Sequence, residues 1–576
     1  MAATDATDTA GEPETAGETG AAGTAGTAGA ADATGLQPSG HADTFPRDHL
    51  PPAALWPDLL LGPQHGALPA YPARLNCGAE LLDATIARLG PDRPAVHDGH
   101  GGLWTYGELA AHVDRIARTL TDDLGVVPGN RVLLRGPTTP WLAACWLAVM
   151  KAGAVAVTVL AAQRPHELAT ICELARIRHA LCDARSLDGL ESLATAVRIT
   201  PYGGDTPGDL LHLAADKPPS YAAAPTSADD VALIAFTSGT TGRPKGCMHF
   251  HRDVLAIADT FSAHVLRPGP DDVFAGSPPL GFTFGLGGLV IFPLRAGAAT
   301  LLTEWRGPGQ LLDDIGRHRV SVLFTAPTAY RSMLELLGEP TGAHDISSLR
   351  RCVSAGEHLP AALWHAWRRA TGLRVINGIG ATEMLHIFIS AADDEIRPGT
   401  TGLPVPGYEA RVLGPGGRPL PDGEPGLLAV RGPTGCRYLA DERQRDYVRD
   451  GWNLTGDTYV RETTGHFRYV ARADDMIISA GYNIAGPEVE EALLRHPDVL
   501  EAAVVGRPDE QRGEIVVAYV VLREEVPGTA ETVAALREFT KKEIVPYKCP
   551  REIEFLAALP RTPTGKLQRF RLRTGS

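Results

Sequence analysis

Positive charge is scarce in this sequence. Its 576 residues include 54 Lys and Arg against 68 Asp and Glu, which gives a formal net charge of −14. Proteins that bind nucleic acid usually present a basic face to the phosphate backbone, so this balance argues against such a partner. Hydrophobic residues make up 44% of the chain. A globular protein with several layers or domains is expected, because one hydrophobic core rarely holds this many residues.

Paired cysteines are also missing. Eight cysteines are scattered along the chain, and no two of them form a C-x-x-C motif. This spacing indicates neither a zinc site nor a disulfide framework. Reduced thiols in a cytoplasmic enzyme are the simpler interpretation.

The sequence has no uninterrupted apolar run long enough to be read as a membrane span. The best candidate, residues 141–162, is broken by Lys151 and Gly153. Its first half is typical of a buried helix, and its β-branched second half of a buried strand. We therefore predict no association with a membrane.

Residues 1–40 contain no Lys, Arg or aromatic residue and consist mainly of Ala, Thr, Gly, Asp and Glu. Such a segment cannot bury enough apolar surface to fold. It also lacks the basic start and apolar centre of a signal peptide. We expect a disordered acidic tail over this range.

Beyond residue 68, strand-like and helix-like segments alternate. Residues 231–236 and 321–326 are typical of buried strands, and a helix is expected from Pro327 to about Leu337. This alternation indicates βαβ units and a mostly parallel sheet. After about Thr400, short strands separated by Gly and Pro turns predict a small antiparallel sheet or barrel.

A second change of pattern comes near Arg472, after which strands and two helices predict a separate domain. The expected fold class is α/β. A large N-terminal domain of αβ-layered sheets plus a small β-barrel is predicted at 41–473, and a smaller α+β C-terminal domain at 474–576.

The strongest local signal is FTSGTTGRPKG at residues 236–246. Glycines let backbone N–H groups approach phosphate oxygens, hydroxyls add hydrogen bonds, and Lys245 supplies a positive charge. The alternative is a flexible surface loop, but the preceding strand and the lysine favour phosphate binding. A Walker A loop is excluded, because Gly246 follows the lysine where that motif needs Ser or Thr.

This loop resembles the phosphate loop of the adenylate-forming superfamily, which includes acyl-CoA synthetases, peptide-synthetase adenylation domains and firefly-type luciferases. Other motifs similar to those of the superfamily follow in the same order: SAGE at 354–357, IGATE at 379–383, TGD at 455–457, Arg472 and PRTPTGK at 560–566. The resemblance covers roughly residues 70 to 570. It implies an AMP-forming ligase that uses ATP, Mg²⁺ and coenzyme A.

The resemblance implies a role for each motif. Lys245, Thr382, Glu383 and Lys566 would be catalytic, with Thr382 on the α-phosphate, Glu383 on Mg²⁺ and Lys566 reaching the carboxylate and phosphate. Ile379 stands where the superfamily has an aromatic residue. The residues expected to bind ATP or AMP are Thr237, Ser238, Gly239, Thr240, Thr241, Gly242, Gly356, Glu357, Asn377, Gly378, Ile379, Asp457 and Arg472.

The residues SPPLGFTFGLGG at 277–288 and TEMLHIFIS at 382–390 resemble the benzoate and 2-aminobenzoate CoA ligase branch. Aromatic acids bind well in flat apolar slots lined by other rings. The alternative for the phenylalanines and Ile387 is packing in the core, and the alternative for His386 is a structural histidine with no contact to the acid. The residues expected to contact the acid are Phe282, Thr283, Phe284, Gly380, His386 and Ile387.

The superfamily rotates its C-terminal domain between two half-reactions, so this chain is expected to do the same. Asp474 stands at the hinge position, and Gly481 lies in a segment that resembles the wall of the pantetheine tunnel. The acyl acceptor is coenzyme A or, alternatively, the phosphopantetheine arm of a carrier protein. No carrier domain follows Ser576, which favours coenzyme A. Whether the chain forms a homodimer is left open.

Two other matches are set aside. His249 and His251 are spaced like metal ligands, but no third ligand is apparent. His251, Arg252 and Asp253 spell a kinase triplet, but Ala258 stands where a kinase needs Asn.

Overall fold

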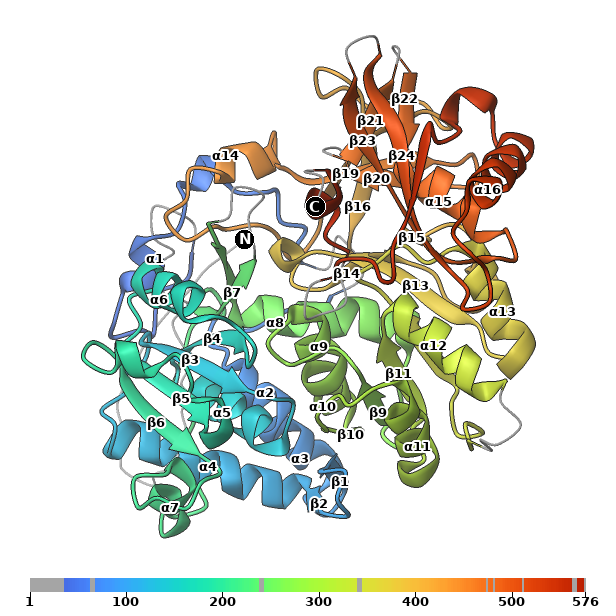
Figure 1. Ribbon diagram of the computed structural model, residues 1–576. Coiled ribbons are helices and arrows are strands. Elements are labelled where there is room, and N and C mark those ends of the chain that lie inside the picture. Colours follow the sequence, from blue (N-terminus) through green and yellow to red (C-terminus); the bar gives the residue numbers. More distant parts are fainter. Residues whose placement is uncertain are drawn as a thin grey trace, which may run out of the picture.

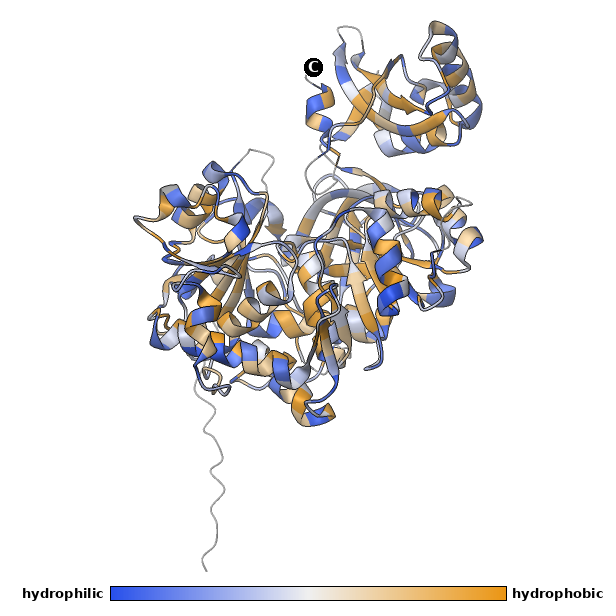
Figure 2. Cartoon of the chain, turned by 60° about the horizontal axis from the view of Figure 1, so that its bottom comes forward, coloured by the Kyte–Doolittle hydropathy of each residue, from blue (hydrophilic) through white to orange (hydrophobic). Residues whose placement is uncertain are grey.

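The computed structural model describes residues 36–62, 68–237, 243–338, 344–472, 475–479, 482–509, 512–561 and 567–573. Two large sheets lie side by side below a smaller C-terminal sheet (Figure 1). The fold is α/β, with a large N-terminal domain and a small α+β C-terminal domain, as the sequence predicted. Figure 2 shows apolar residues on the strands of each sheet and many polar residues on the outer helices.

The first sheet has six strands in the order β6-β5-β3-β4-β7-β8. All neighbours are parallel except β7 and β8, which form an antiparallel pair. Parallel strands that are covered on both faces have continuous apolar sequences, and residues 231–236 follow this pattern. The strands are β3 (Arg131–Gly136), β4 (Val155–Leu160), β5 (His179–Asp183), β6 (Arg198–Tyr202), β7 (Val231–Thr237) and β8 (Lys245–Phe250).

The second sheet has nine strands in the order β15-β14-β13-β12-β11-β9-β10-β1-β2. Its centre is parallel, and antiparallel strands close both edges. The strands are β1 (Pro94–His97), β2 (Leu103–Thr105), β9 (Val273–Gly276), β10 (Ala299–Leu301), β11 (Val322–Thr325), β12 (Arg351–Ser354), β13 (Val375–Gly380), β14 (Ile387–Ser390) and β15 (Leu403–Pro404).

Helices cover and separate these two sheets. The segment predicted as a buried helix is α5, in which every residue except Trp141 is buried. The helix predicted at Pro327 has the predicted bounds. The helices are α1 (Phe45–Asp48), α2 (Cys77–Leu81), α3 (Asp83–Leu89), α4 (Tyr106–Asp122), α5 (Pro140–Lys151), α6 (Pro165–Leu174), α7 (Leu210–Ala215), α8 (His251–Ile257), α9 (Thr283–Leu286), α10 (Phe292–Ala296), α11 (Pro308–His318), α12 (Pro327–Leu337), α13 (Ala361–Thr371) and α14 (Gln444–Tyr447).

Beyond residue 400 the predicted small antiparallel sheet is present. Its five strands are β16 (Glu409–Leu413), β17 (Pro425–Arg431), β18 (Val448–Arg449), β19 (Trp452–Arg461) and β20 (Phe467–Arg472). The C-terminal domain has a second five-stranded sheet with two helices packed on it and a short third helix near the end. These elements are β21 (Met476–Ser479), β22 (Tyr482–Ala485), α15 (Gly486–Leu494), β23 (Val499–Asp509), β24 (Gly513–Leu522), α16 (Ala530–Glu543), β25 (Glu552–Phe555) and α17 (Arg569–Arg573).

Strand β20 ends at Arg472 and strand β21 of the C-terminal sheet begins at Met476. The domain boundary predicted between residues 473 and 474 lies outside the described residues. The N-terminal limit differs from the prediction. Leu36 is buried, and Gly40 donates its backbone N–H to Asp230 at 2.7 Å. Leu36 to Gly40 therefore belong to the folded part, although the sequence predicted a disordered tail to residue 40. Residues 1–35 lie outside the described residues.

All eight cysteines lie within the described residues, and all are free and buried. Burial raises the pKa of Cys172 to about 11, and those of Cys182 and Cys352 to about 12. Within the described part of the chain, no helix is long and apolar enough to span a bilayer. The run at 141–162 divides instead into α5 and β4.

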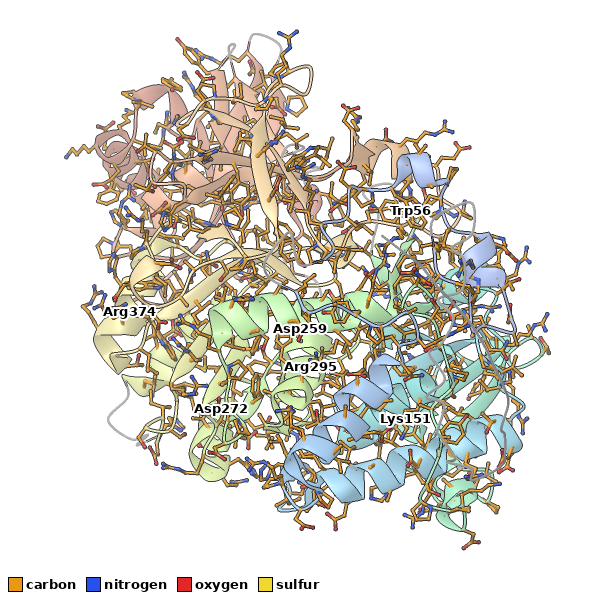
Figure 3. All side chains as sticks on the ribbon, turned by 180° about the vertical axis from the view of Figure 1, so that it is seen from behind. Trp56, Lys151, Asp259, Asp272, Arg295 and Arg374 are labelled. Atoms are coloured by element: carbon orange, nitrogen blue, oxygen red, sulfur yellow. The ribbon has the colours of Figure 1, made fainter. Side chains whose placement is uncertain are left out.

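A buried ion pair closes the C-terminal end of α5. Lys151 is 1% exposed, and its Nζ donates to Asp114 Oδ1 at 2.5 Å and to Asp83 Oδ1 at 2.9 Å (Figure 3). Burial raises the pKa of Asp114, and the Lys151 ammonium opposes that effect. The lysine therefore joins α5 to α3 and α4.

Replacing Lys151 by Ala should leave the buried Asp114 carboxylate without its partner. We expect Lys151→Ala to lower the free energy of unfolding by about 3–5 kcal/mol, measured by chemical denaturation followed by tryptophan fluorescence. The control is Lys217→Ala, which breaks the pair with Asp123 at the surface and should cost at most about 1 kcal/mol. Equal losses in the two variants would contradict the role of the buried pair.

Candidate active site

The predicted phosphate loop connects two antiparallel strands. β7 ends at Thr237 and β8 begins at Lys245, and these two residues lie opposite each other in the register. Lys245 is thereby held at the loop end of the hairpin, with its side chain 19% exposed. The loop residues that the motif predicts lie outside the described residues: Ser238, Gly239, Thr240, Thr241 and Gly242.

Three side chains from distant parts of the chain meet at this hairpin. Lys245 Nζ donates a hydrogen bond to Tyr438 Oη at 2.8 Å, and the Tyr438 hydroxyl donates to Glu383 Oε1 at 2.5 Å. Lys245 Nζ also lies 3.7 Å from Glu383 Oε1. Burial raises the pKa of Tyr438 far above its ordinary value, so the phenol keeps its proton. The structure brings Lys245 and Glu383 together, and adds Tyr438, which no sequence motif indicated.

Thr382 and Glu383 lie in a single 3-10 turn, Thr382–Met384, that follows β13. The Thr382 carbonyl lies 2.8 Å from His249 Nε2. A carbonyl can only accept, so Nε2 must carry the proton and donate it. Burial lowers the pKa of His249 to about 4, which keeps the ring neutral. His249 therefore anchors the turn that carries the two predicted catalytic residues.

A buried polar cluster lies behind this turn. Asp253 Oδ2 accepts from Arg437 Nη1 at 2.8 Å and from the Phe250 backbone N–H at 3.0 Å, and it lies 3.9 Å from His249 Nδ1. Asp253 and Arg437 have no exposed surface, and the guanidinium lies 4.0 Å from the centre of the Phe250 ring. Charges this deep are tolerated only when they are paired and hydrogen-bonded. The cluster fixes β8, α8 and the segment at Arg437 relative to one another.

The two histidines spaced like metal ligands point to different partners. His249 binds Thr382, whereas His251 Nδ1 accepts the backbone N–H of Cys77 at 3.1 Å. Among the residues that the structure describes, no group of three or more His, Cys, Asp or Glu is placed to bind a metal.

The two residues predicted to hold the ribose lie side by side. Asp457 on β19 faces Arg472 on β20 in the antiparallel register, and Arg472 Nη1 lies 3.1 Å from Asp457 Oδ1. Gly456 between Thr455 and Asp457 has a φ of 76°, and a Cβ there would lie 3.0 Å from the Arg472 guanidinium. The carboxylate and the guanidinium can together offer an acceptor and donors to a diol.

The segment predicted to line the adenine pocket follows β12. Gly356 has a φ of 88°, and burial raises the pKa of the Glu357 carboxyl while the nearby Arg561 guanidinium lowers it. Arg561 Nη1 lies 3.5 Å from Glu357 Oε1, and its Nη2 donates to Glu501 at 2.6 Å. The C-terminal domain is thereby attached beside the predicted adenine segment.

Arg561 also pairs with Leu567 in a short antiparallel bridge, which encloses residues 562–566. Arg561, which precedes that segment, is the residue that contacts Glu357. The predicted catalytic residue Lys566 belongs to this segment and lies outside the described residues. The predicted hinge residue Asp474 and the predicted tunnel residue Gly481 also lie outside the described residues.

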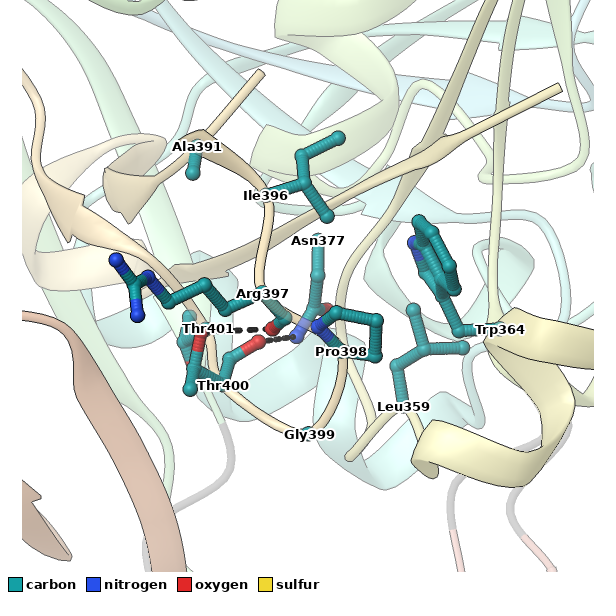
Figure 4. A pocket seen from close by; sticks show the side chains of 10 residues that line it. All are labelled: Leu359, Trp364, Asn377, Ala391, Ile396, Arg397, Pro398, Gly399, Thr400 and Thr401. Atoms are coloured by element: carbon teal, nitrogen blue, oxygen red, sulfur yellow. Dashed lines mark hydrogen bonds between the residues drawn. The ribbon is translucent and has the colours of Figure 1, made fainter. Parts of the chain in front are cut away.

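Asn377 lies on β13. Its Nδ2 donates to the Thr400 carbonyl at 3.3 Å, in a small pocket also lined by Trp364 and Leu359 (Figure 4). Ile379, two residues further, is half-buried and packs against the main core. A glycine is required at two positions of this strand: a Cβ on Gly378 would lie 2.8 Å from Ile387, and one on Gly380 would lie 2.8 Å from the His386 carbonyl.

Among the predicted acid-binding residues, Phe284 and Gly380 lie next to His386. Its ring is 2% exposed, and its Nε2 lies 3.4 Å from the Phe284 carbonyl. Burial lowers the pKa of His386 to about 3, so the ring is neutral. Its Nδ1 is buried and has no hydrogen-bond partner among the described residues. Four phenylalanine rings lie within 4.6–6.4 Å of it, centre to centre: Phe261, Phe284, Phe292 and Phe324.

Only Phe284 of these four rings was predicted from the sequence. Phe261 lies in a π-helical continuation of α8 (Ala258–Leu266), and Phe292 follows a second π-helical turn (Gly287–Ile291). Such turns are frequent at functional sites because they shift side chains out of helical register. Phe282 and Thr283 are half-buried at the start of α9, and Ile387 is buried against Gly378.

Comparison with known proteins agrees with these motifs. The family model of AMP-binding enzymes matches residues 83–438, and the model of their C-terminal domain matches residues 488–566. The chain is 34% identical over 517 residues to a benzoate–CoA ligase of Thauera aromatica, covering 87% of this chain and 96% of the relative.

Two solved structures are similar over nearly their whole length. The anthranilate CoA ligase AuaEII, solved with anthranoyl-AMP, has a TM-score of 0.82 and 32% identity, and the match covers 88% of this chain and 98% of that one. ATP-bound MatB from Rhodopseudomonas palustris has a TM-score of 0.80 and 30% identity, covering 87% and 98%.

The depressed pKa of His386 predicts an acid-dependent loss of stability. A histidine in the unfolded chain titrates near pH 6.5. Between that value and about 3, the unfolded chain holds one more proton than the folded chain at this position. The free energy of unfolding therefore falls as the pH drops through this window.

His386→Gln removes this proton difference. We expect the slope of unfolding free energy against pH, measured by denaturation between about pH 6 and 4.5, to be smaller than in the wild type by about 1.4 kcal/mol per pH unit. His100→Gln changes an exposed histidine and should leave the slope unchanged. A wild-type slope in the His386 variant would show that this ring is protonated in the folded state.

Proposed function

The chain belongs to the AMP-binding enzyme family, and on this premise we propose that it activates a benzoate-type acid with ATP and transfers the acyl group to coenzyme A. It is an acid–thiol ligase of the AMP-forming acyl-CoA synthetase family. The observation that carries the proposed chemistry is the meeting of Lys245 and Glu383, which the sequence separates widely, at 3.7 Å.

We propose that the first half-reaction takes place at this cluster. A carboxylate oxygen of the acid attacks the α-phosphorus of ATP, the bond to the β-phosphate breaks, and pyrophosphate leaves with the bonding electrons. Such a reaction is accelerated mainly by positioning and by charge stabilisation. Lys245 and Lys566 supply positive charge, Thr382 contacts the α-phosphate, and Asp457 with Arg472 holds the ribose.

The residues present fit a magnesium ion. Glu383 offers a buried carboxylate oxygen, and Mg²⁺ prefers a few carboxylates together with nucleotide phosphates. When bound, the ion would neutralise phosphate charge as pyrophosphate leaves. Glu383 would be its protein ligand, and Lys245 would hold the neighbouring phosphate oxygens.

The second half-reaction is proposed to follow a rotation of the C-terminal domain at Asp474, with a domain boundary between residues 473 and 474. The thiol of coenzyme A, entering past Gly481, attacks the acyl carbonyl. The bond to AMP breaks, and the thiol proton passes to solvent. A stand-alone adenylation enzyme that loads a carrier protein is the alternative, and formation of acyl-CoA with free coenzyme A alone distinguishes the two.

The acid is proposed to be aromatic because a benzoate–CoA ligase and an anthranilate CoA ligase are similar to this chain over most of its length, and because the half-buried Phe284 ring lies 5.6 Å from that of His386. Of the four phenylalanines around His386, Phe261, Phe292 and Phe324 are fully buried in the core, whereas the half-buried Phe284 can offer its ring to an aromatic acid. The favoured substrates are 2-aminobenzoate and 2-hydroxybenzoate, with unsubstituted benzoate as the alternative. The buried Nδ1 of His386 could accept a hydrogen bond from an ortho amino or hydroxyl group. Pyrophosphate release measured across a panel of benzoic acids and medium-chain fatty acids tests this proposal, and a preference for fatty acids would overturn it.

Lys566→Ala should cripple the first half-reaction. A lysine next to the developing negative charge typically contributes about 10²–10³ in rate. Pyrophosphate release should fall by that factor, whereas acyl-CoA formation from supplied acyl-adenylate should proceed at the wild-type rate. An equal loss in both half-reactions would show that Lys566 does not serve adenylation alone.

His386→Ala should separate two roles of the histidine. If Nδ1 accepts the ortho group, kcat/KM should fall more for 2-aminobenzoate than for benzoate, because a site built for a hydrogen bond discriminates more strongly than an apolar one. The extra loss is expected to be about tenfold. Equal losses on the two acids would assign His386 to the carboxylate or to packing.

A further inference from the structure

Tyr438 occupies a position that none of the motifs explains. Its hydroxyl accepts from Lys245 at 2.8 Å and donates to Glu383 at 2.5 Å, so it bridges the two residues. The Lys245 ammonium also lies 4.7 Å from the centre of the Tyr438 ring. The uncharged Tyr438 side chain thus contacts both Lys245 and Glu383, two of the charged residues proposed to act on ATP.

The tyrosine is rigidly held. Its segment extends the hairpin sheet, because Met248 donates its N–H to the Arg437 carbonyl and Leu439 donates to that of Gly246, each at 2.8 Å. The Tyr438 backbone N–H is bound by the Gln444 side chain at 2.9 Å. Tyr438 has no exposed surface. A side chain fixed in this way can impose its geometry on its neighbours.

Because of this bridge, the two carboxylate oxygens of Glu383 have different surroundings. Oε1 accepts the Tyr438 hydroxyl and faces Lys245. Within the part of the chain that the structure describes, no hydrogen bond reaches Oε2. The carboxylate therefore has one oxygen committed to the protein and one oxygen available to a ligand. Core packing alone would not need the hydroxyl, because a phenylalanine ring would fill the same space.

We propose that Tyr438 is a positioning residue for the adenylation half-reaction: it orients the Glu383 carboxylate so that Oε2 meets the divalent cation of the nucleotide, and it holds Lys245 where its ammonium can meet the neighbouring phosphate oxygens. This inference rests on the proposed function. A carboxylate held in place binds a cation more tightly than a mobile one, because less rotational freedom is lost on binding. Hydrogen bonds linked in series also strengthen one another.

The test is Tyr438→Phe, which keeps the ring and removes the bridge. Binding of Mn²⁺ in the presence of ATP is measured by electron paramagnetic resonance, a readout that needs no turnover. We expect a loss of affinity of about 10- to 100-fold, as for a hydrogen bond to a charged group. Pyrophosphate release should fall at low Mg²⁺ and recover in part at high Mg²⁺, whereas acyl-CoA formation from supplied acyl-adenylate should be unchanged.

Tyr447→Phe is the matched control. This ring lies 5.8 Å from that of Tyr438, and its buried hydroxyl has no hydrogen-bond partner among the described residues. Its Mn²⁺ affinity should equal that of the wild type. A wild-type Mn²⁺ affinity in Tyr438→Phe, or an equal loss in both variants, would overturn the inference.

A double-mutant cycle separates orientation from packing. In a Glu383→Gln background, Tyr438→Phe should cause no further loss of Mn²⁺ affinity, since the carboxylate that it orients is gone. A loss that persists in this background would show that Tyr438 acts through packing and would overturn the inference. If the wild type released no pyrophosphate with any acid, the proposed function would fail, while the Mn²⁺ measurements would still decide the role of Tyr438.

Discussion

The buried pair of Asp253 and Arg437 is the interaction on which the geometry of the candidate site depends. It joins the first turn of α8 to a segment that lies far away in the sequence, and neither side chain has any contact with water. Because an unpaired charge at this depth is strongly unfavourable, the two segments cannot separate without a large cost. Arg437 therefore fixes its neighbour Tyr438, and Asp253 lies beside His249, which holds the Thr382 carbonyl.

The sequence predicted those parts of the structure that repeat or that form local motifs. Strand β7 and helix α12 have continuous apolar or helical patterns, and Lys245 and Glu383 stand in motifs with fixed spacing. Tyr438 could not be predicted, since it has no local pattern and its two partners come from other elements. The folded segment at Leu36 was missed for a related reason: composition indicates a tail, but Asp230 accepts hydrogen bonds from the Ser39 hydroxyl and the Gly40 backbone N–H just after it. A contact between two residues that are far apart in the sequence produces no repeating pattern, so the sequence alone does not predict it.

The contact between Arg561 and Glu357 links the C-terminal domain to the segment of the N-terminal domain that is predicted to line the adenine pocket. Arg561 stands at the start of the segment that carries Lys566, and Glu357 lies in the predicted adenine segment. Arg331 adds a hydrogen bond to the Leu500 carbonyl at 3.0 Å. Polar contacts of this kind are typical of interfaces between domains that move relative to each other, which agrees with the proposed rotation.

The burial of all eight cysteines has a chemical consequence for the proposed reaction. An acyl-adenylate reacts with any accessible thiolate, and a protein with a reactive cysteine near its active site would be acylated by its own intermediate. Here burial raises the thiol pKa values, so the thiolate form is scarce and shielded. Cys247 and Cys436 lie close to Tyr438, in the same small core, yet neither has exposed surface. The protein thereby protects itself from self-acylation and leaves the activated acid to the incoming thiol.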